Sequence, residues 1–274
     1  MNVEQARAGG SGFKTSLRCV MSKNLYGLSV KKQQEGWKKL ARFVDQDWWL
    51  RMIAADDAAM KQLAVSLVPI SDPILDTAVQ SRARAIMGKN FLGLEEVRRG
   101  YGIALDSEPL AEIPFSEETL QACKDTHVLV AGSALSVNEI RKIADSDFYD
   151  TDWYKREPFA NDKKVSVRWY LLRSAPVPES RNKTYDQQCS LLTKEEEVPF
   201  ACEMTYMVIL YWRVYCERLL PDVYVRCQDK DSISYRIVVG NFDSGGFDVV
   251  RYWDDVRFDA CGLASSVPPL PARP

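Results

Sequence analysis

The chain has a single histidine, His127, among its 274 residues, and its seven cysteines include no Cys-x-x-Cys pair. One histidine excludes most sites that combine several imidazoles, so we expect no metal and no cofactor. An odd number of dispersed cysteines is typical of reduced thiols. We therefore expect a protein made in a reducing cytoplasm, and its final localisation stays open.

Long apolar runs and an excess of charge of one sign are also missing. No run approaches the roughly 18 residues of a membrane span. The first residues, "MNVEQARAGGSGFKTS", lack the basic-then-apolar pattern of a secretion signal. The net charge of −2 gives no electrostatic reason to expect a nucleic-acid partner. We expect no membrane insertion and no nucleic-acid binding.

Lysine, glutamate, glutamine and methionine are absent from Asp231 to Pro274, although the whole chain has seven methionines. Strands disfavour some of these residues, but a complete absence exceeds that preference. Codons that end in C or T encode none of the four, nor tryptophan. Randomising the first two bases of AAC or AAT codons would produce this pattern, with Trp253 belonging to an unvaried frame. A β-rich surface that is merely short of long amphipathic side chains is the alternative.

The residues that remain in this segment are typical of binding surfaces. The stretch "RYWDDVRFDACGLASS" (251–266) combines tyrosine, tryptophan and arginine with aspartate and serine. Aromatic and arginine side chains supply wide, stiff contact area, and the short polar ones supply adaptable hydrogen bonds.

The chain divides into parts that differ in composition and in hydrophobic pattern. Residues 1–30 are predicted to be irregular or disordered. Residues 31–115 are predicted to form a helical module, because apolar residues such as Trp37, Leu40 and Val44 recur at helical spacing. A second helix is predicted to open at 71–73. The linker "DSEPLAEIPFSEE" leads to a predicted domain at 116–267, and residues 268–274 form a Pro-rich tail.

Residues 116–267 mix helices and strands. We predict strands in "THVLVAGSA" and "VSVRWYLLR" (165–173), and a helix in "SVNEIRKIA" that is capped by Ser136 with Glu139. A short helix is predicted in "TYDQQCSLL", and Pro199 introduces a long apolar helix from about Ala201. The strands "DVYVRC", "ISYRIVVG" and "GGFDVV" follow. Helices first and short antiparallel strands last predict an α+β fold.

Four weaker motifs favour structural interpretations. "GGSGFKTS" (9–16) lacks the glycine before lysine of a phosphate loop. The aspartates of 145–152 lack the glycine and distal glutamate of a calcium loop. Cys123 and His127 are four residues apart, but His127 begins an apolar strand and is predicted to be structural. The PxxP pattern of "VPPLPARP" is predicted to be a frayed terminus.

The last third of the chain resembles a known family. "EVPFACEMTYMVILYWRVYCERLLPDVYVRC" followed by "DSISYRIVVGNFDSGGFDVVRYWDDVRFDACGLASS" resembles the C-terminal half of C-type lectin-like domains, and more narrowly the variable proteins of diversity-generating retroelements. The resemblance rests on the proline-led helix, the strand at 224–227, the strand pair that starts at Tyr235, and the closing Trp253, Arg257 and Gly262. The resemblance covers roughly 120–266, and the helical first part lies outside it.

The resemblance implies a C-type lectin-like domain in which frame residues hold the backbone while the positions between them vary. Trp253, Arg257 and Gly262 would be frame, and Arg251, Tyr252 and Phe258 would anchor the ligand. "WDD" (253–255) echoes an element of calcium-dependent lectins, but no Glu-Pro-Asn or Gln-Pro-Asp precedes it, so we do not expect calcium-dependent sugar binding. The positions expected to face the ligand are Tyr235, Asn241, Asp248, Val250, Arg251, Tyr252, Asp254, Asp255, Val256, Phe258 and Asp259.

The leading expectation is a ligand-binding protein, not an enzyme, that recognises a protein or other macromolecule. The superfamily also includes formylglycine-generating enzymes, so a cysteine-dependent enzyme is the first alternative. It would require a depressed thiol pKa at Cys227 or Cys261. A structural interaction protein that assembles through Trp37, Trp48 and Trp49 is the second alternative.

Overall fold

The computed structural model describes residue 74 and residues 76–270. The helix predicted within 31–68, its tryptophans and the phosphate-loop-like motif lie outside these residues. Residues 74–212 and 217–274 cluster into one compact unit. The described helices are α5 (Ala78–Met87), α6 (Leu94–Tyr101), α7 (Glu117–Cys123), α8 (Val137–Ile143), α9 (Pro158–Asn161), α10 (Tyr185–Cys189) and α11 (Ala201–Tyr215).

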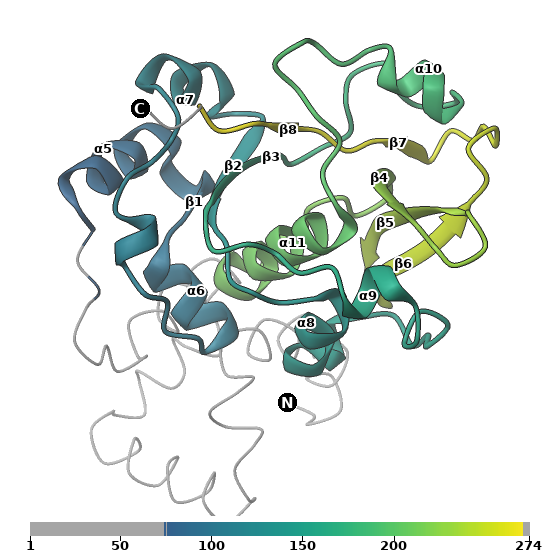
Figure 1. Cartoon of the computed structure of the whole chain (residues 1–274), viewed down its shortest axis with the longest axis horizontal. Coiled ribbons are helices and arrows are strands. Elements are labelled where there is room, and N and C mark those ends of the chain that lie inside the picture. Colours follow the sequence, from purple (N-terminus) through teal and green to yellow (C-terminus); the bar gives the residue numbers. More distant parts are fainter. Residues whose placement is uncertain (1–73, 75, 271–274) are drawn as a thin grey trace, which may run out of the picture. The chain divides into compact units, whose positions relative to one another are not determined.

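Two small mixed sheets make an α+β fold (Figure 1). The first has the order β1-β2-β3-β8, and the second has the order β6-β5-β4-β7. The strands are β1 (Phe91–Leu92), β2 (His127–Ala131), β3 (Trp169–Arg173), β4 (Tyr224–Lys230), β5 (Arg236–Asp243), β6 (Gly246–Tyr252), β7 (Cys261–Leu263) and β8 (Ser266–Val267). The predicted strands at 127, 224, 236 and 246 are confirmed, and β3 begins at Trp169 rather than at Val165.

Helix α11 lies between the two sheets (Figure 1). It touches both of them, because the Tyr206 hydroxyl donates to the Ala131 carbonyl of β2 at 2.9 Å and the Ala201 amide donates to Asp229 of β4. Residues 201–212 are all buried, which explains why its sequence is apolar all round. The helix therefore forms the centre of the core, and the second sheet is built against it.

Capping decides where the shorter helices start. Helix α8 begins after Ser136, whose side chain and Glu139 form the predicted capping box. Helix α5 begins at Ala78 and not at 71–73, because the Thr77 side chain accepts from the Gln80 amide. The prediction was wrong here, and Ile74 precedes the helix.

The boundary expected at residue 115 falls inside one unit. Strand β1 pairs in parallel with β2, so residues on both sides of the linker share a sheet. The Trp169 indole donates to the Leu110 carbonyl at 2.9 Å, which ties the linker to β3. At the other end, the Leu270 amide donates to the Pro114 carbonyl at 2.9 Å. Residues 74–115 therefore complete the core of the C-terminal part.

No helix within the described residues is long and apolar enough to cross a membrane.

Candidate ligand-binding face

The positions expected to face a ligand lie on the hairpin of β5 and β6 and on the loop 253–260, which leads into β7 (Figure 1, yellow). In β6 the side chains alternate across the sheet. Asp248, Val250 and Tyr252 therefore share one face, and Arg251 points to the other. Six of the eleven expected positions fall into two groups, and each group has its own contacts.

The first group is a tyrosine cluster made of Tyr224, Asn241, Asp248, Tyr252 and Phe258. The Tyr224 hydroxyl donates to Asp248 Oδ2 at 2.9 Å. The Phe258 ring centroid lies 4.7 Å from that of Tyr252 and 6.5 Å from that of Tyr224. All five side chains are partly exposed, so the cluster is open to solvent. Asn241 has a φ of 45°, a left-handed conformation that asparagine tolerates better than most residues.

The second group is an arginine stack made of Trp153, Asp231, Tyr235, Arg251 and Trp253. The Arg251 guanidinium lies 4.7 Å from the Trp153 ring centroid and 5.3 Å from that of Tyr235. The Tyr235 and Trp253 rings stack at 3.9 Å. Arg251 also pairs with Asp231, whose side chain is fully buried. Truncating Arg251 would leave that carboxylate unpaired, so Arg251 has a structural role besides its exposed position.

A buried arginine holds the middle of the loop. Arg226, on β4, is fully buried, and its Nη1 donates to the Lys183 carbonyl and to Gln188 Oε1, both at 2.9 Å. Its Nη2 donates to the Val256 carbonyl. The three groups that accept from Arg226 are two main-chain carbonyls and the side-chain amide of a buried glutamine. The hydrogen bond from Arg226 to the loop is therefore independent of the Val256 side chain.

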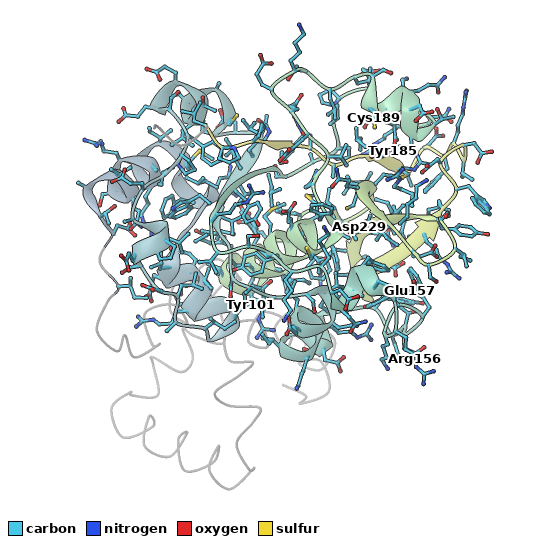
Figure 2. The ribbon with its side chains drawn as sticks, viewed as in Figure 1. Tyr101, Arg156, Glu157, Tyr185, Cys189 and Asp229 are labelled. Atoms are coloured by element: carbon cyan, nitrogen blue, oxygen red, sulfur yellow. The ribbon has the colours of Figure 1, made fainter. Side chains whose placement is uncertain are left out.

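Three further main-chain contacts hold the loop at its ends. The Tyr185 amide donates to the Asp254 carbonyl at 2.8 Å, and Tyr185 lies on α10 (Figure 2). The Asn182 amide donates to the Phe258 carbonyl at 3.3 Å, and the Tyr224 amide donates to the Ala260 carbonyl at 2.7 Å. Because these contacts use backbone atoms, the side chains at 255–259 can change without removing them.

Asp254 is an exception among the expected ligand-facing residues. Both of its carboxylate oxygens accept from Arg236, at 2.9 and 3.0 Å, and Lys230 lies 2.9 Å away. Burial alone would raise the pKa of Asp254, but the hydrogen bonds from Arg236 and Lys230 lower it. The Arg236 guanidinium also covers the Tyr185 ring at 3.6 Å. The Asp254 carboxylate is therefore tied to β4 and β5, which leaves it less available to a ligand than the exposed Asp255 and Asp259.

The expected frame residues also divide. Trp253 is 49% exposed and Arg257 is exposed, so neither is buried as a frame residue would be. Gly262 is buried, and a Cβ there would lie 2.5 Å from Pro176 Cβ and 2.7 Å from Ser180 Oγ. Only glycine fits at this position. Asp255 and Asp259 are exposed, as expected of ligand-facing positions, and Val256 is partly exposed.

The cysteines that an enzyme would use are buried. Cys227 and Cys261 are each at most 1% exposed. Burial raises the pKa of the Cys227 thiol well above its usual range and that of Cys261 to about 11. A nucleophilic cysteine needs the opposite shift. The geometry therefore gives no support to a thiolate at either position.

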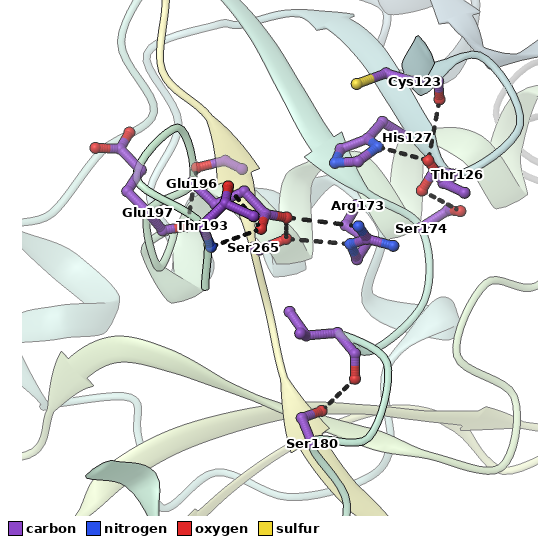
Figure 3. Close-up of polar contacts among 12 residues, drawn as sticks. Cys123, Thr126, His127, Arg173, Ser174, Ser180, Thr193, Glu196, Glu197 and Ser265 are labelled. Atoms are coloured by element: carbon purple, nitrogen blue, oxygen red, sulfur yellow. Dashed lines mark hydrogen bonds and ion pairs between the residues drawn. The ribbon is translucent and has the colours of Figure 1, made fainter. Parts of the chain in front are cut away.

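The Cys123 and His127 pair has structural partners (Figure 3). The His127 ring is 3% exposed, and its Nδ1 bonds the Thr126 hydroxyl at 2.8 Å. Burial, with help from the charge of Arg173, lowers the pKa of His127 to about 4, and burial raises the pKa of Cys123. Arg173 in turn bonds Ser265 and Glu196. This arrangement keeps the imidazole neutral and the thiol protonated at neutral pH.

Three of the four aspartates of 145–152 bond protein groups. Arg141 pairs with Asp145, the Trp212 indole donates to Asp147, and Lys155 pairs with Asp152. In the part of the chain that the structure describes, no group of three histidine, cysteine, aspartate or glutamate side chains is placed to hold a metal ion.

The residues that sequence reasoning missed are those that position the loop. Arg226 lies between Val225 and Cys227, and Arg236 directly precedes Ile237, so each is a charged residue beside apolar ones, which is the one signal that could have identified them. Trp153 lies about a hundred residues from Arg251 in the chain, and no local pattern links the two. Comparison with protein-family models, curated proteins and solved structures finds no match to this chain.

Proposed function

We propose that the chain is a ligand-binding protein whose C-terminal face is diversified in sequence, on a C-type lectin-like scaffold of the kind found in the variable proteins of diversity-generating retroelements. The ligand is a protein or another macromolecule. Binding uses side chains that project from the β5–β6 hairpin and from the loop 253–260, and no chemical step is involved.

One observation carries the proposal. The loop 253–260 lies within the segment 231–274 that lacks lysine, glutamate, glutamine and methionine, and its backbone carbonyls are held by Arg226 and by the amides of 182, 185 and 224. A segment whose backbone is fixed by residues outside it tolerates changes of side chain without refolding. The loop with the fixed backbone thus lies inside the segment of unusual composition.

The arrangement of elements supports the scaffold. A long buried helix, α11, is followed by a three-stranded antiparallel run and then by β7, which pairs in parallel with β4. This order matches the spacings on which the resemblance rests. The burial of Cys227 and Cys261 leaves the enzymatic alternative without a reactive group.

The test is to sequence the 3′ end of this gene across its source population. We expect substitutions to concentrate at exposed positions of the face, in codons that end in C or T. Arg226, Arg236, Asp254 and Gly262 should stay fixed, because the backbone depends on them. The positions expected to vary are Tyr235, Asn241, Asp248, Val250, Arg251, Tyr252, Asp255, Val256, Phe258 and Asp259.

The codons of β2 and β3 provide the internal control, because these strands are buried and distant from the face. Sparse substitutions spread evenly over the hairpin, the loop and the control strands would contradict the proposal. Substitutions at the face whose codons end in A or G as often as in C or T would also contradict it, since such changes indicate ordinary drift.

A further inference from the structure

Asp248 is a half-buried carboxylate at the centre of the tyrosine cluster. One of its oxygens accepts from the Tyr224 hydroxyl at 2.9 Å. Burial raises the pKa of Asp248, and the nearby charge of Asp243 raises it further. Among the described residues no lysine or arginine forms an ion pair with Asp248, in contrast to Asp231, which pairs with Arg251, and Asp254, which pairs with Arg236.

Three aromatic rings extend from this carboxylate across the cluster. Tyr224 contacts it directly, and Tyr252 lies four residues further along β6, on the same face of the strand. Phe258 packs against both rings, tilted by 55° to Tyr252 and by 63° to Tyr224. The faces of aromatic rings carry negative potential, and a carboxylate adds a full negative charge. All of these side chains remain partly exposed to solvent.

We propose that the tyrosine cluster binds the guanidinium of an arginine side chain on the protein ligand, with Asp248 as its counter-ion and Tyr252 and Phe258 as the stacking surfaces. The inference rests on the proposed function and names the chemistry of one part of its ligand. Asp248, Tyr252 and Phe258 belong to the positions proposed to vary, so this preference is a property of this chain.

A guanidinium fits this cluster better than a neutral polar group does. It stacks on aromatic rings and offers paired N–H donors to a carboxylate. Asp248 has already lost part of its hydration, so binding a cation relieves a cost that the free protein carries. A neutral group of the same shape would gain the stacking but would leave the charge uncompensated.

The experiment compares two probes of nearly the same shape on the full-length protein. N-acetyl-arginine amide is titrated at pH 7 against N-acetyl-citrulline amide, in which the guanidinium becomes a neutral urea. The NMR signals of the tyrosine and phenylalanine rings report binding. We expect saturable shifts with the arginine probe and at least tenfold weaker effects with citrulline.

Two variants localise the effect. Asp248→Asn keeps an acceptor for the Tyr224 hydroxyl but removes the charge, and it should lower the affinity for the arginine probe at least tenfold. Asp222→Asn is the control: it removes an exposed charge just before β4, and its affinity for the arginine probe should equal that of the wild type. Equal binding of both probes, no binding of either, or unchanged binding by Asp248→Asn would overturn the inference.

The inference and the proposed function fail separately. If the arginine probe does not bind but the gene varies at the positions of the face, only the assignment of an arginine partner is wrong. If the probe binds while the gene shows no concentrated variation, the cation site is supported and the proposal of a diversified face is wrong.

Discussion

His127 is buried beside Arg173, and its protonation predicts how stability responds to acid. Its pKa is about 4 in the folded protein, against about 6.5 when unfolded. Between these values the unfolded chain binds more protons, so stability is complete above pH 6.5 and is lost as pH falls toward 4. We expect a loss of about 2 kcal/mol from this residue between pH 7.5 and pH 5.

The measurement is urea unfolding at both pH values for the wild type and for His127→Asn. Asparagine can keep a hydrogen bond with Thr126, but it does not titrate. The variant should therefore lose less stability on acidification than the wild type does. An identical loss in both proteins would mean that His127 charges freely in the native state.

For single residues, the sequence alone could not decide which of two similar side chains has a partner in the fold. Asp254 and Asp255 are adjacent and chemically identical, and both were expected to face the ligand. Only the folded chain brings Arg236 and Lys230 onto Asp254, while Asp255 stays exposed. Composition singles out the segment, and the contacts of each side chain within it depend on partners that come from β4, β5 and α10.

At the level of elements, apolar runs, alternation and caps gave correct predictions, including the short helices α8 and α10. Helix α11 was predictable from its long apolar run after a proline, and the strands of the hairpin from their β-branched residues between turns. Strand β1 has two residues, too few to show any period. Missing it placed a domain boundary at residue 115, although β1 extends the sheet of β2. The sequence did not show that the side chains of this segment divide between the two faces of β6.

The β5–β6 turn depends on Gly246. Its φ is +118°, which side chains rarely adopt, and an added Cβ would lie 2.5 Å from the Tyr149 amide nitrogen. Gly246→Ala should therefore destabilise the protein by about 3 kcal/mol or more, through strain and a backbone clash. Gly245→Ala is the matched control, because its Cβ would come no closer than 3.1 Å, to a flexible Asp243 oxygen.

Urea unfolding of the two variants measures the difference. The control should lie within about 1 kcal/mol of the wild type. Equal stability of both variants would show that the turn rearranges easily, and the hairpin would then be a poor scaffold for side chains that must keep fixed positions.

For the whole molecule, the described residues depend on contacts that span the chain. The Phe91 ring lies 5.3 Å from that of Trp169, and Trp169 bonds Leu110. Residues near 91 and 110 thus cover the sheet on which the C-terminal part is built. A binding face can be rigid only if this core is complete, so the boundary of the folding unit matters for function.

Two fragments test where that boundary lies. The fragment 74–274 keeps α5, β1 and α6, so it should unfold in one cooperative transition and give a dispersed amide spectrum. The fragment 116–274 begins at the boundary that the sequence suggested, and it removes the parallel partner of β2 together with the ring that packs on Trp169. It should collapse without fixed packing or aggregate, since a buried strand edge and an apolar surface are then exposed. If the shorter fragment instead unfolds cooperatively with the same urea midpoint as the longer one, residues 74–115 are an accessory layer. In that case the C-terminal part folds as an independent domain.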